Sequence, residues 1–156
     1  MSLDQASLTK LDTVHPNLAS VVLKCAEICP VAFKVVEGVR SDEQAYINFG
    51  KGRTAEECTA AGCDKKYAQP HVARVTWLKN PLNTKHRAAA DGKSRAVDLL
   101  PAPYDWKATG PFDTVAHHMF RAASLLDIHI RWGADWDEDG LPREKGETDS
   151  PHFELV

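Results

Sequence analysis

The residues best suited to chemistry in this chain are two imidazoles and two carboxylates. His152 stands in the segment Thr-Asp-Ser-Pro-His-Phe-Glu-Leu, and Asp149 precedes it by three residues. Upstream lie His86, in Thr-Lys-His, and Asp98, in Ala-Val-Asp. Two imidazoles and one carboxylate can hold a catalytic zinc ion that keeps one position open for water. The second carboxylate can then take a proton from that water, so the set predicts metal-assisted hydrolysis.

The other candidate metal ligands have weaker contexts. No carboxylate or glycine pattern marks the five remaining histidines as ligands (His15, His71, His117, His118 and His129). The four cysteines, Cys25, Cys29, Cys58 and Cys63, could form a structural zinc site, but such sites favour tighter spacings. The alternative is that Cys25 and Cys29 pack as small hydrophobes on a helix. Cys58 and Cys63 could pair only in an oxidising setting.

Composition excludes several classes of protein. The chain has 156 residues, which fits one domain with a substantial core. Its net charge is −3, with lysines and arginines scattered among carboxylates, so we expect no nucleic-acid partner. No apolar run approaches the roughly 18–20 residues that span a membrane, so we expect no membrane insertion. The first residues show no signal-peptide pattern, which predicts synthesis in a cytoplasm.

Hydrophobic periodicity predicts a mixture of helices and strands. The predicted helices are 17–29, a short helix from a Ser41/Gln44 capping box toward Gly50, 54–61 ending at Gly62, and 112–126 with Val115, Met119, Ala122, Leu125 and Leu126 on its apolar face. The predicted strands are 33–37, 72–78, 94–100, 128–132 and 152–156. This order of elements indicates an α+β fold. Residues 50–83 read as a long surface excursion, which is either functional or a simple insertion.

Asp98 interrupts the apolar run of residues 95–100. A carboxylate buried in a strand requires a partner or a metal ion, which strengthens its candidacy as a ligand.

These segments resemble the zinc D,D-carboxypeptidases and the phage L-alanyl-D-glutamate endopeptidases. That family carries Ser-x-His, then Ala-Val-Asp after a glycine, and a carboxylate-x-x-His near its C-terminus. The matching residues here are Thr84-Lys85-His86, Gly92, Ala96-Val97-Asp98 and Asp149 to His152, together with Gly38-Val39-Arg40-Ser41 and Gly133-Ala134-Asp135-Trp136. The resemblance covers nearly the whole chain apart from residues 50–83. Two departures are Thr84 in place of serine and twelve residues between His86 and Asp98, which is more than the family's common spacing.

The resemblance implies a single zinc peptidase domain of residues 1–156, with the Hedgehog/D,D-peptidase fold of a small antiparallel sheet and flanking helices. It implies zinc held by His86, Asp98 and His152, with Asp149 as general base. Arg40 would stabilise the developing oxyanion. The alternatives are that Arg40 forms an ion pair with Glu37 or Asp42, and that Asp149 is a capping or turn residue.

An acidic run suggests a second cation. Asp135, Asp137 and Asp139, followed by Gly140, match the start of a calcium-binding loop, but Gly146 stands where the final glutamate is expected. Some phage members of the family are similar here and respond to calcium. The alternative interpretation is a solvated acidic turn beside the active site.

The resemblance implies a monomeric phage or prophage endolysin that cleaves the L-alanyl-D-glutamate bond of bacterial peptidoglycan. Such an enzyme is made in the host cytoplasm and reaches the cell wall after release. Two alternatives stay open: a D,D- or L,D-carboxypeptidase of the same family, and a non-catalytic wall-binding module that contains zinc.

Overall fold

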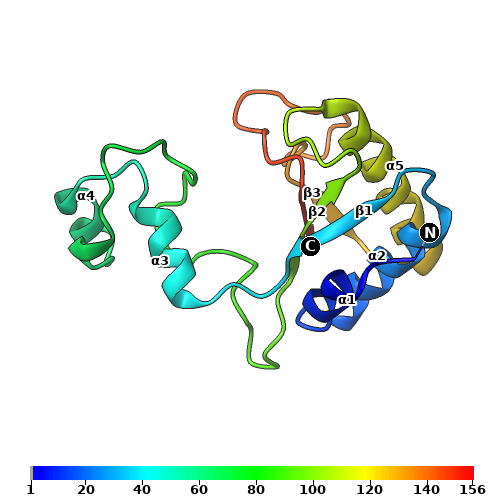
Figure 1. Cartoon of the computed structure of the whole chain (residues 1–156), viewed down its shortest axis with the longest axis horizontal. Helices are drawn as coiled ribbons and strands as arrows, with labels where there is room; N and C mark the ends of the chain where they lie inside the picture. The colour runs from blue at the N-terminus through cyan, green and yellow to red at the C-terminus, as the bar shows by residue number, and fades with distance from the viewer. Residues whose placement is uncertain (1) are drawn as a thin grey trace.

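A four-stranded antiparallel sheet organises the molecule. The computed structural model describes residues 2–156, in which the strands are β1 (Phe33–Glu37), β2 (Ala96–Pro101), β3 (Ile130–Trp132) and β4 (His152–Leu155). Their order across the sheet is β1-β2-β4-β3 (Figure 1). The strand latest in sequence is therefore internal, and it lies between two strands that do not pair with each other.

The two faces of the sheet have different roles. Successive residues of a strand point to opposite faces. Val97 and Leu99 of β2 enter the main hydrophobic core, so Asp98 between them faces the other way. Asp98 pairs in register with His152 of β4 and, beyond a bulge, with Glu37 of β1. Strand pairing alone thus brings three polar side chains together on the face opposite the core.

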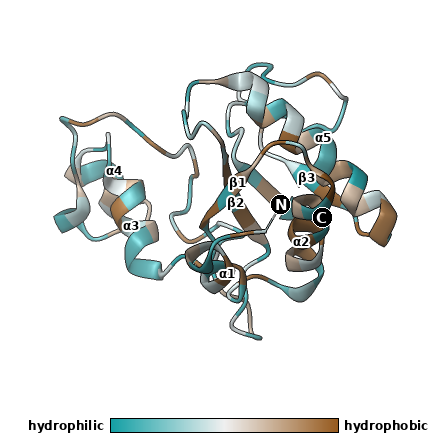
Figure 2. Ribbon diagram, turned by 45° about the vertical axis from the view of Figure 1, so that its right-hand side comes forward, coloured by the Kyte–Doolittle hydropathy of each residue, from teal (hydrophilic) through white to brown (hydrophobic). Residues whose placement is uncertain are grey.

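Two long helices cover the core face. Helix α2 (Pro16–Ile28) buries Leu18, Val21, Val22, Cys25 and Ala26, and α5 (Thr109–Leu126) packs against it. Hydrophobic colouring is concentrated on the strands and on α2 (Figure 2). A short helix, α1 (Gln5–Leu11), lies against β1. Within residues 2–156, no helix combines the length and the apolar character needed to cross a membrane.

Residues 42–79 form a lobe that stands apart from the sheet (Figure 1). It contains α3 (Asp42–Gly50), α4 (Ala55–Ala60) and the 3-10 helix η1 (Lys65–Tyr67). A second, smaller hydrophobic cluster of Phe49, Cys58 and Cys63 holds it together, with Tyr46 and Tyr67 packed against it. The chain leaves the sheet for the lobe just after Arg40 and returns at His86.

The predicted fold class is confirmed, and most predicted elements are present with small shifts of their ends. The predicted strand 72–78 is wrong, because no other strand lies beside this segment to supply hydrogen bonds. Leu125 and Leu126 do not pack as predicted: they are exposed, since the last turn of α5 extends beyond the core. Ser41 caps α3 through Gln44 N–H as expected, but the reciprocal capping box occurs at Thr54 and Glu57 instead. Helix α1 was not predicted.

All four cysteines are buried free thiols. Cys25 and Cys29 belong to the main core, and Cys58 and Cys63 to the cluster of the lobe. The two pairs lie in different clusters, which agrees with hydrophobic packing and not with one four-cysteine zinc site.

Candidate metal centre and active site

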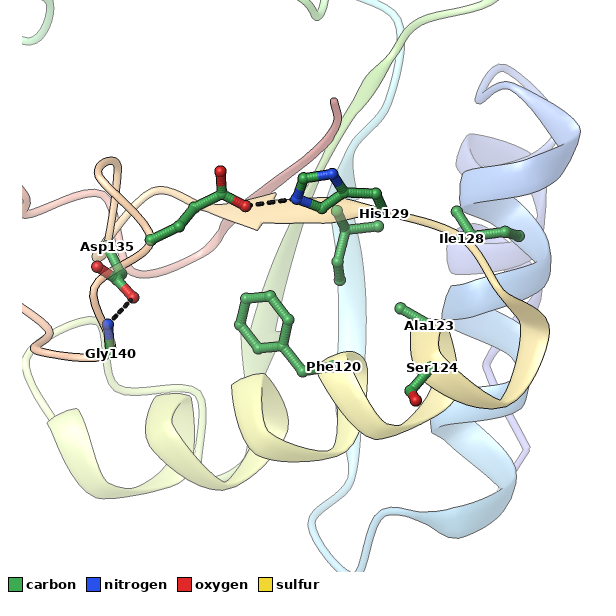
Figure 3. A pocket seen from close by; sticks show the side chains of 9 residues that line it. Phe120, Ala123, Ser124, Ile128, His129, Asp135 and Gly140 are labelled. Carbon is green, nitrogen blue, oxygen red and sulfur yellow. Dashed lines mark hydrogen bonds and ion pairs between the residues drawn. The ribbon is translucent and has the colours of Figure 1, made fainter.

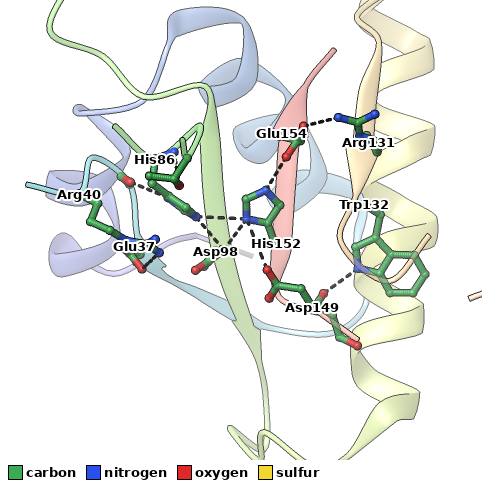
Figure 4. A network of polar contacts seen from close by, with 12 residues as sticks. Glu37, Arg40, His86, Asp98, Arg131, Trp132, Asp149, His152 and Glu154 are labelled. Carbon is green, nitrogen blue, oxygen red and sulfur yellow. Dashed lines mark hydrogen bonds and ion pairs between the residues drawn. The ribbon is translucent and has the colours of Figure 1, made fainter. Parts of the chain in front are cut away.

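The structure brings His86, Asp98 and His152 to one point (Figure 4). His86 Nε2 lies 3.2 Å from Asp98 Oδ1 and 3.2 Å from His152 Nδ1, and the third separation, from His152 Nδ1 to Asp98 Oδ1, is 3.4 Å. Tetrahedral zinc with bonds of about 2.0–2.1 Å has ligand atoms about 3.3–3.4 Å apart. The three donor atoms therefore have the spacing of three corners of a zinc tetrahedron.

The hydrogen bonds on the far side of each imidazole define which nitrogen faces this point. His86 Nδ1 lies 2.8 Å from the carbonyl oxygen of Gly38, which can only accept, so Nδ1 carries the proton. His152 Nε2 lies 2.8 Å from Glu154 Oε1, so in the neutral ring this nitrogen is the donor. The two remaining nitrogens present lone pairs toward each other and toward the Asp98 carboxylate. Three converging acceptors in a buried site fit a cation.

The electrostatics of the site also favour positive charge. Burial opposes the charged form of His152, but hydrogen bonds to Asp98 and Glu154 prevail and raise its pKa to about 9. Burial likewise raises the pKa of Asp98, but hydrogen bonds to His152 and His86 outweigh it and leave that pKa well below its usual value. A site with this balance attracts either a proton or a metal ion.

Glu154 is fixed by two cations from other segments. Its Oε2 accepts from Arg131 at 2.8 Å and lies 3.1 Å from Lys85 Nζ. Burial would raise the pKa of Glu154, but hydrogen bonds to His152 and Arg131 lower it to about 2. Glu154 is therefore ionised at neutral pH and orients the His152 ring, as carboxylates behind metal-binding histidines do.

Asp149 lies beside the triad of His86, Asp98 and His152. Its Oδ2 is 3.8 Å from His152 Nδ1, and its side chain is 52 % exposed. Partial enclosure raises the pKa of Asp149, and the nearby Asp98 charge adds to the effect, against the attraction of His152. A carboxylate with a raised pKa, open to water on one side, is suited to accept a proton.

Gly133 makes room for this arrangement. A Cβ at that position would lie 2.3 Å from the carbonyl oxygen of Asp149 and 3.0 Å from Cβ of His152. Gly133 N–H also donates to His152 O at 2.7 Å, and Asp149 N–H donates to Gly133 O at 3.1 Å. The segment after β3 therefore holds the carboxylate and the histidine by direct backbone contact.

Arg40 lies near the triad but is paired with Glu37. Its Nε is 2.5 Å from Glu37 Oε1, and a second nitrogen donates to Oε2 at 3.0 Å. The side chain of Arg40 is only 15 % exposed. Burial opposes its charge, but the hydrogen bonds to Glu37 outweigh it and raise the pKa of Arg40, and the charges of Asp98 and Asp149 act in the same direction. Arg40 thus forms the ion pair with Glu37 that was considered as an alternative, and its guanidinium still lies close to the triad.

The twelve-residue interval between His86 and Asp98 does not separate them. A tight turn absorbs the extra residues: Ala89 N–H donates to Lys93 O, and Gly92 adopts a positive φ of 77° at its tip. The chain then enters β2 in the right register. A turn at Asp91-Gly92 thus accommodates the longer interval.

The acidic loop, residues 135–147, contains two groups of carboxylates whose oxygens lie close together, and both groups include Asp137. One group is Asp135, Asp137 and Asp139, and the other is Asp137, Glu144 and Glu147. Asp135 also accepts from the backbone N–H of Gly140 at 3.0 Å, beside the open pocket between α5 and β3 (Figure 3). Glu147 is buried, and its Oε1 has no hydrogen-bond partner among the described residues. Glu147 thus approaches the loop next to the position where Gly146 replaces the expected glutamate.

Some contributors to the site were not predicted. The contact of His86 with the Gly38 carbonyl has no signal in the sequence, because every residue has a backbone carbonyl. Trp136, whose ring centroid lies 5.3 Å from that of His152, could have been found in the Gly-Ala-Asp-Trp segment.

Two imidazoles and a carboxylate around one point, with a second carboxylate beside them in a small α+β domain, form a candidate metal site of the kind found in hydrolases. The model of the phage L-alanyl-D-glutamate peptidase family matches residues 1–66 and 64–156, and the chain belongs to this family. It is 28 % identical over 153 residues to the L-alanyl-D-glutamate peptidase of Escherichia phage T5, covering 94 % of this chain and 92 % of that one. The crystal structure of the Serratia marcescens L-Ala D-Glu endopeptidase ChiX has the same fold, with a TM-score of 0.58 and 23 % identity over 99 % of this chain and 90 % of that one.

Proposed function

We propose that this protein is a zinc-dependent endopeptidase that cleaves the L-alanyl-D-glutamate bond in the stem peptide of bacterial peptidoglycan. The observation that carries the proposal is the converging lone pairs of His86, Asp98 and His152 at zinc spacing. The names of the family and of the T5 relative support the bond and the substrate. We further propose that it acts as a monomer, as a phage or prophage endolysin that reaches the wall after release from the host cytoplasm.

In this proposal each polar residue has one task. His86, Asp98 and His152 hold the zinc ion, which when bound lowers the pKa of a coordinated water to about 7 and polarises a carbonyl. Asp149 takes the proton of the attacking water and passes it to the leaving amine as the peptide C–N bond breaks. Arg40, held by Glu37, offers positive charge to the oxygen that becomes negative.

The test is analysis of both metal and products. Purified protein should contain one zinc per chain, and mass spectrometry of digested sacculi should show stem peptides released from the glycan, with a new N-terminal D-glutamate. Loss of only a terminal D-alanine would instead assign a carboxypeptidase. Zinc without any product would assign a wall-binding module.

We also propose that the acidic loop binds calcium. Its support is the sharing of Asp137 between two oxygen groups and the unpartnered buried oxygen of Glu147. Carboxylate oxygens in this number and density are the ligands that calcium prefers.

A further inference from the structure

The lobe of residues 42–79 differs from the rest of the molecule in charge and in exposed aromatic surface. The lobe contains six basic and five acidic side chains, a net charge of +1, whereas the rest of the molecule contains 13 basic and 17 acidic, a net charge of −4. The positive charge is concentrated in residues 51–79, which contain six basic and three acidic side chains. Trp77 is 75 % exposed and Val75 is 52 % exposed. An exposed tryptophan offers a large, flat apolar surface on which a ligand can pack.

A groove of about 400 Å³ lies beside Trp77. Its walls include Phe49, Trp77, Arg74 and Lys79, and Glu57 is the acidic residue among its lining. An aromatic surface with a few charged groups is the usual lining of a ligand site. The composition of this groove fits a ligand that has both an apolar face and negative charge.

The backbone beneath the groove is held in place. Arg53 is buried, and its guanidinium donates to the carbonyl oxygens of Phe49 at 2.7 Å, Thr76 at 2.8 Å and Leu78 at 3.3 Å. These bonds tie the irregular segment that carries Trp77 to α3. Trp77 is therefore presented to solvent from a fixed backbone, which lowers the entropy lost on binding.

Two cations of the groove are open to a ligand. Arg74 contacts Glu57 through one nitrogen at 3.2 Å, and its side chain is 37 % exposed. Lys79 is exposed and has no ion pair among residues 2–156. Both can meet a carboxylate, and the arginine can do so with two hydrogen bonds.

We propose that this groove binds a peptidoglycan strand away from the bond that is cut, with a sugar ring on Trp77 and stem-peptide carboxylates at Arg74 and Lys79. The inference rests on the proposed function for the identity of the polymer. Charge complementarity supports it, because a stem peptide with D-glutamate is anionic and is repelled by the acidic body but attracted by residues 51–79. The groove is thus an anchoring site built into the catalytic domain.

The attachment of the lobe relates this anchor to the metal centre. The chain enters the lobe after Arg40 and leaves it at His86, and the backbone N–H of Arg40 donates to His86 O at 2.8 Å. A strand held on the lobe is consequently held at a defined offset from the ligands of the site. Anchoring should therefore raise the rate of cleavage of a polymer, which can occupy the groove and the metal centre together. It should not change the rate for a short peptide, which can occupy only one of them.

The experiment compares Trp77→Ala and the double variant Arg74→Gln/Lys79→Gln with matched changes in the body. Trp106→Ala removes another exposed tryptophan, 57 % accessible, and Lys107→Gln/Arg121→Gln removes two other exposed charges. Each protein is assayed on purified sacculi stripped of attached polymers and on a short soluble stem peptide. Sedimentation with the same sacculi is measured in an Asp149→Asn background, so that the polymer is not digested.

We expect kcat/KM on sacculi and the sedimented fraction to fall about tenfold or more in both lobe variants, as for loss of an aromatic or arginine anchor. Hydrolysis of the short peptide, and every reading of the two control variants, should stay at the wild-type level. Unchanged turnover of sacculi by both lobe variants would overturn the inference. The assay is repeated on walls that retain phosphate-rich polymers, and a defect seen only on those walls would also overturn it. So would a wild-type dimer that dissociates in Trp77→Ala. A wild-type protein that cuts neither substrate but sediments through Trp77 would reject the proposed function and keep the groove.

Discussion

Both ring nitrogens of His152 are held by other side chains of the site. One ring nitrogen faces Asp98 and His86, and the other is held by Glu154 at 2.8 Å. Because Glu154 is itself fixed by Arg131 and Lys85, the ring has one orientation in which its lone pair points to the centre of the triad. Pre-orientation of this kind strengthens metal binding.

Replacing His152 with alanine should abolish zinc binding. Two ligands remain, His86 and Asp98, and they cannot complete a site that needs three protein donors. Metal content is measured by mass spectrometry after gel filtration, with His117→Ala, an exposed histidine on α5, as the control. Full zinc occupancy in His152→Ala would show that the ion is held elsewhere.

Asp149→Asn should keep zinc but lose turnover. The amide has nearly the same shape and leaves the three ligands in place, but it cannot accept the proton. Loss of a general base costs about a hundred- to ten-thousand-fold in rate. The matched control is Asp127→Asn, at a left-handed position that accepts asparagine readily. A wild-type rate in Asp149→Asn would assign the base to another residue.

At the scale of elements, the backbone after β3 positions the proposed catalytic groups as much as the strands do. Strand β4 supplies His152 and the turn before it supplies Asp149, but both rest against Gly133. The acidic loop begins two residues later, at Asp135. A change in this segment is therefore transmitted to the active site through direct contact.

Gly133→Ala should lower both stability and activity. The added methyl group would meet the Asp149 carbonyl oxygen at 2.3 Å, which is backbone and cannot rotate away. Overpacking of this kind lowers the free energy of unfolding by about 1–3 kcal/mol. Urea denaturation and peptide hydrolysis are the measurements, and Gly110→Ala, which adds a methyl group with no atom within 4 Å, is the control. Unchanged kcat in Gly133→Ala would mean that the contact does not position the site.

Calcium should raise activity by ordering residues 135–147. Hydrogen bonding to Asp139 and repulsion from it raise the pKa of Glu144, which shows how crowded these carboxylates are. A bound dication relieves the repulsion. Calorimetric titration and lysis assays with a calcium-selective chelator test this, and Asp137→Asn/Asp139→Asn should lose the response. Absence of binding heat, with equal lysis in both buffers, would leave the loop as a solvated acidic turn.

At the scale of the whole molecule, the sequence predicted the parts whose signals are local or repeated. The helical period of α2 and the apolar run of β2 were sufficient to predict the fold class. The motifs around His86, Asp98 and His152, together with the family resemblance, predicted which side chains lie together. The predicted strand 72–78 is absent, because a strand forms only where a neighbouring strand pairs with it. The Gly38 carbonyl and the groove beside Trp77 depend on how distant segments meet, which no local pattern encodes.

Removal of zinc should destabilise the entire domain. The three ligands come from β2, β4 and the segment that returns from the lobe, so the ion connects elements far apart in sequence. Occupancy at a thousandfold excess over Kd stabilises a fold by about 4 kcal/mol. Thermal unfolding with and without a zinc chelator, in calcium-saturated buffer, is the measurement. The chelator should lower the Tm of the wild type, and one equivalent of zinc should restore it. The Tm of His152→Ala should change with neither reagent.

The internal position of β4 has a consequence for how the molecule opens and closes. Strands β2 and β3 touch β4 but not each other, so without residues 152–155 the sheet exists as two unconnected pieces. Opening of β4 therefore breaks hydrogen bonds along both of its edges and dismantles the triad in the same event. Amide hydrogens of β2, β3 and β4 should exchange with solvent together, as one cooperative unit. A partly opened molecule then has no intact triad, and peptidase activity reports on closure of the whole sheet.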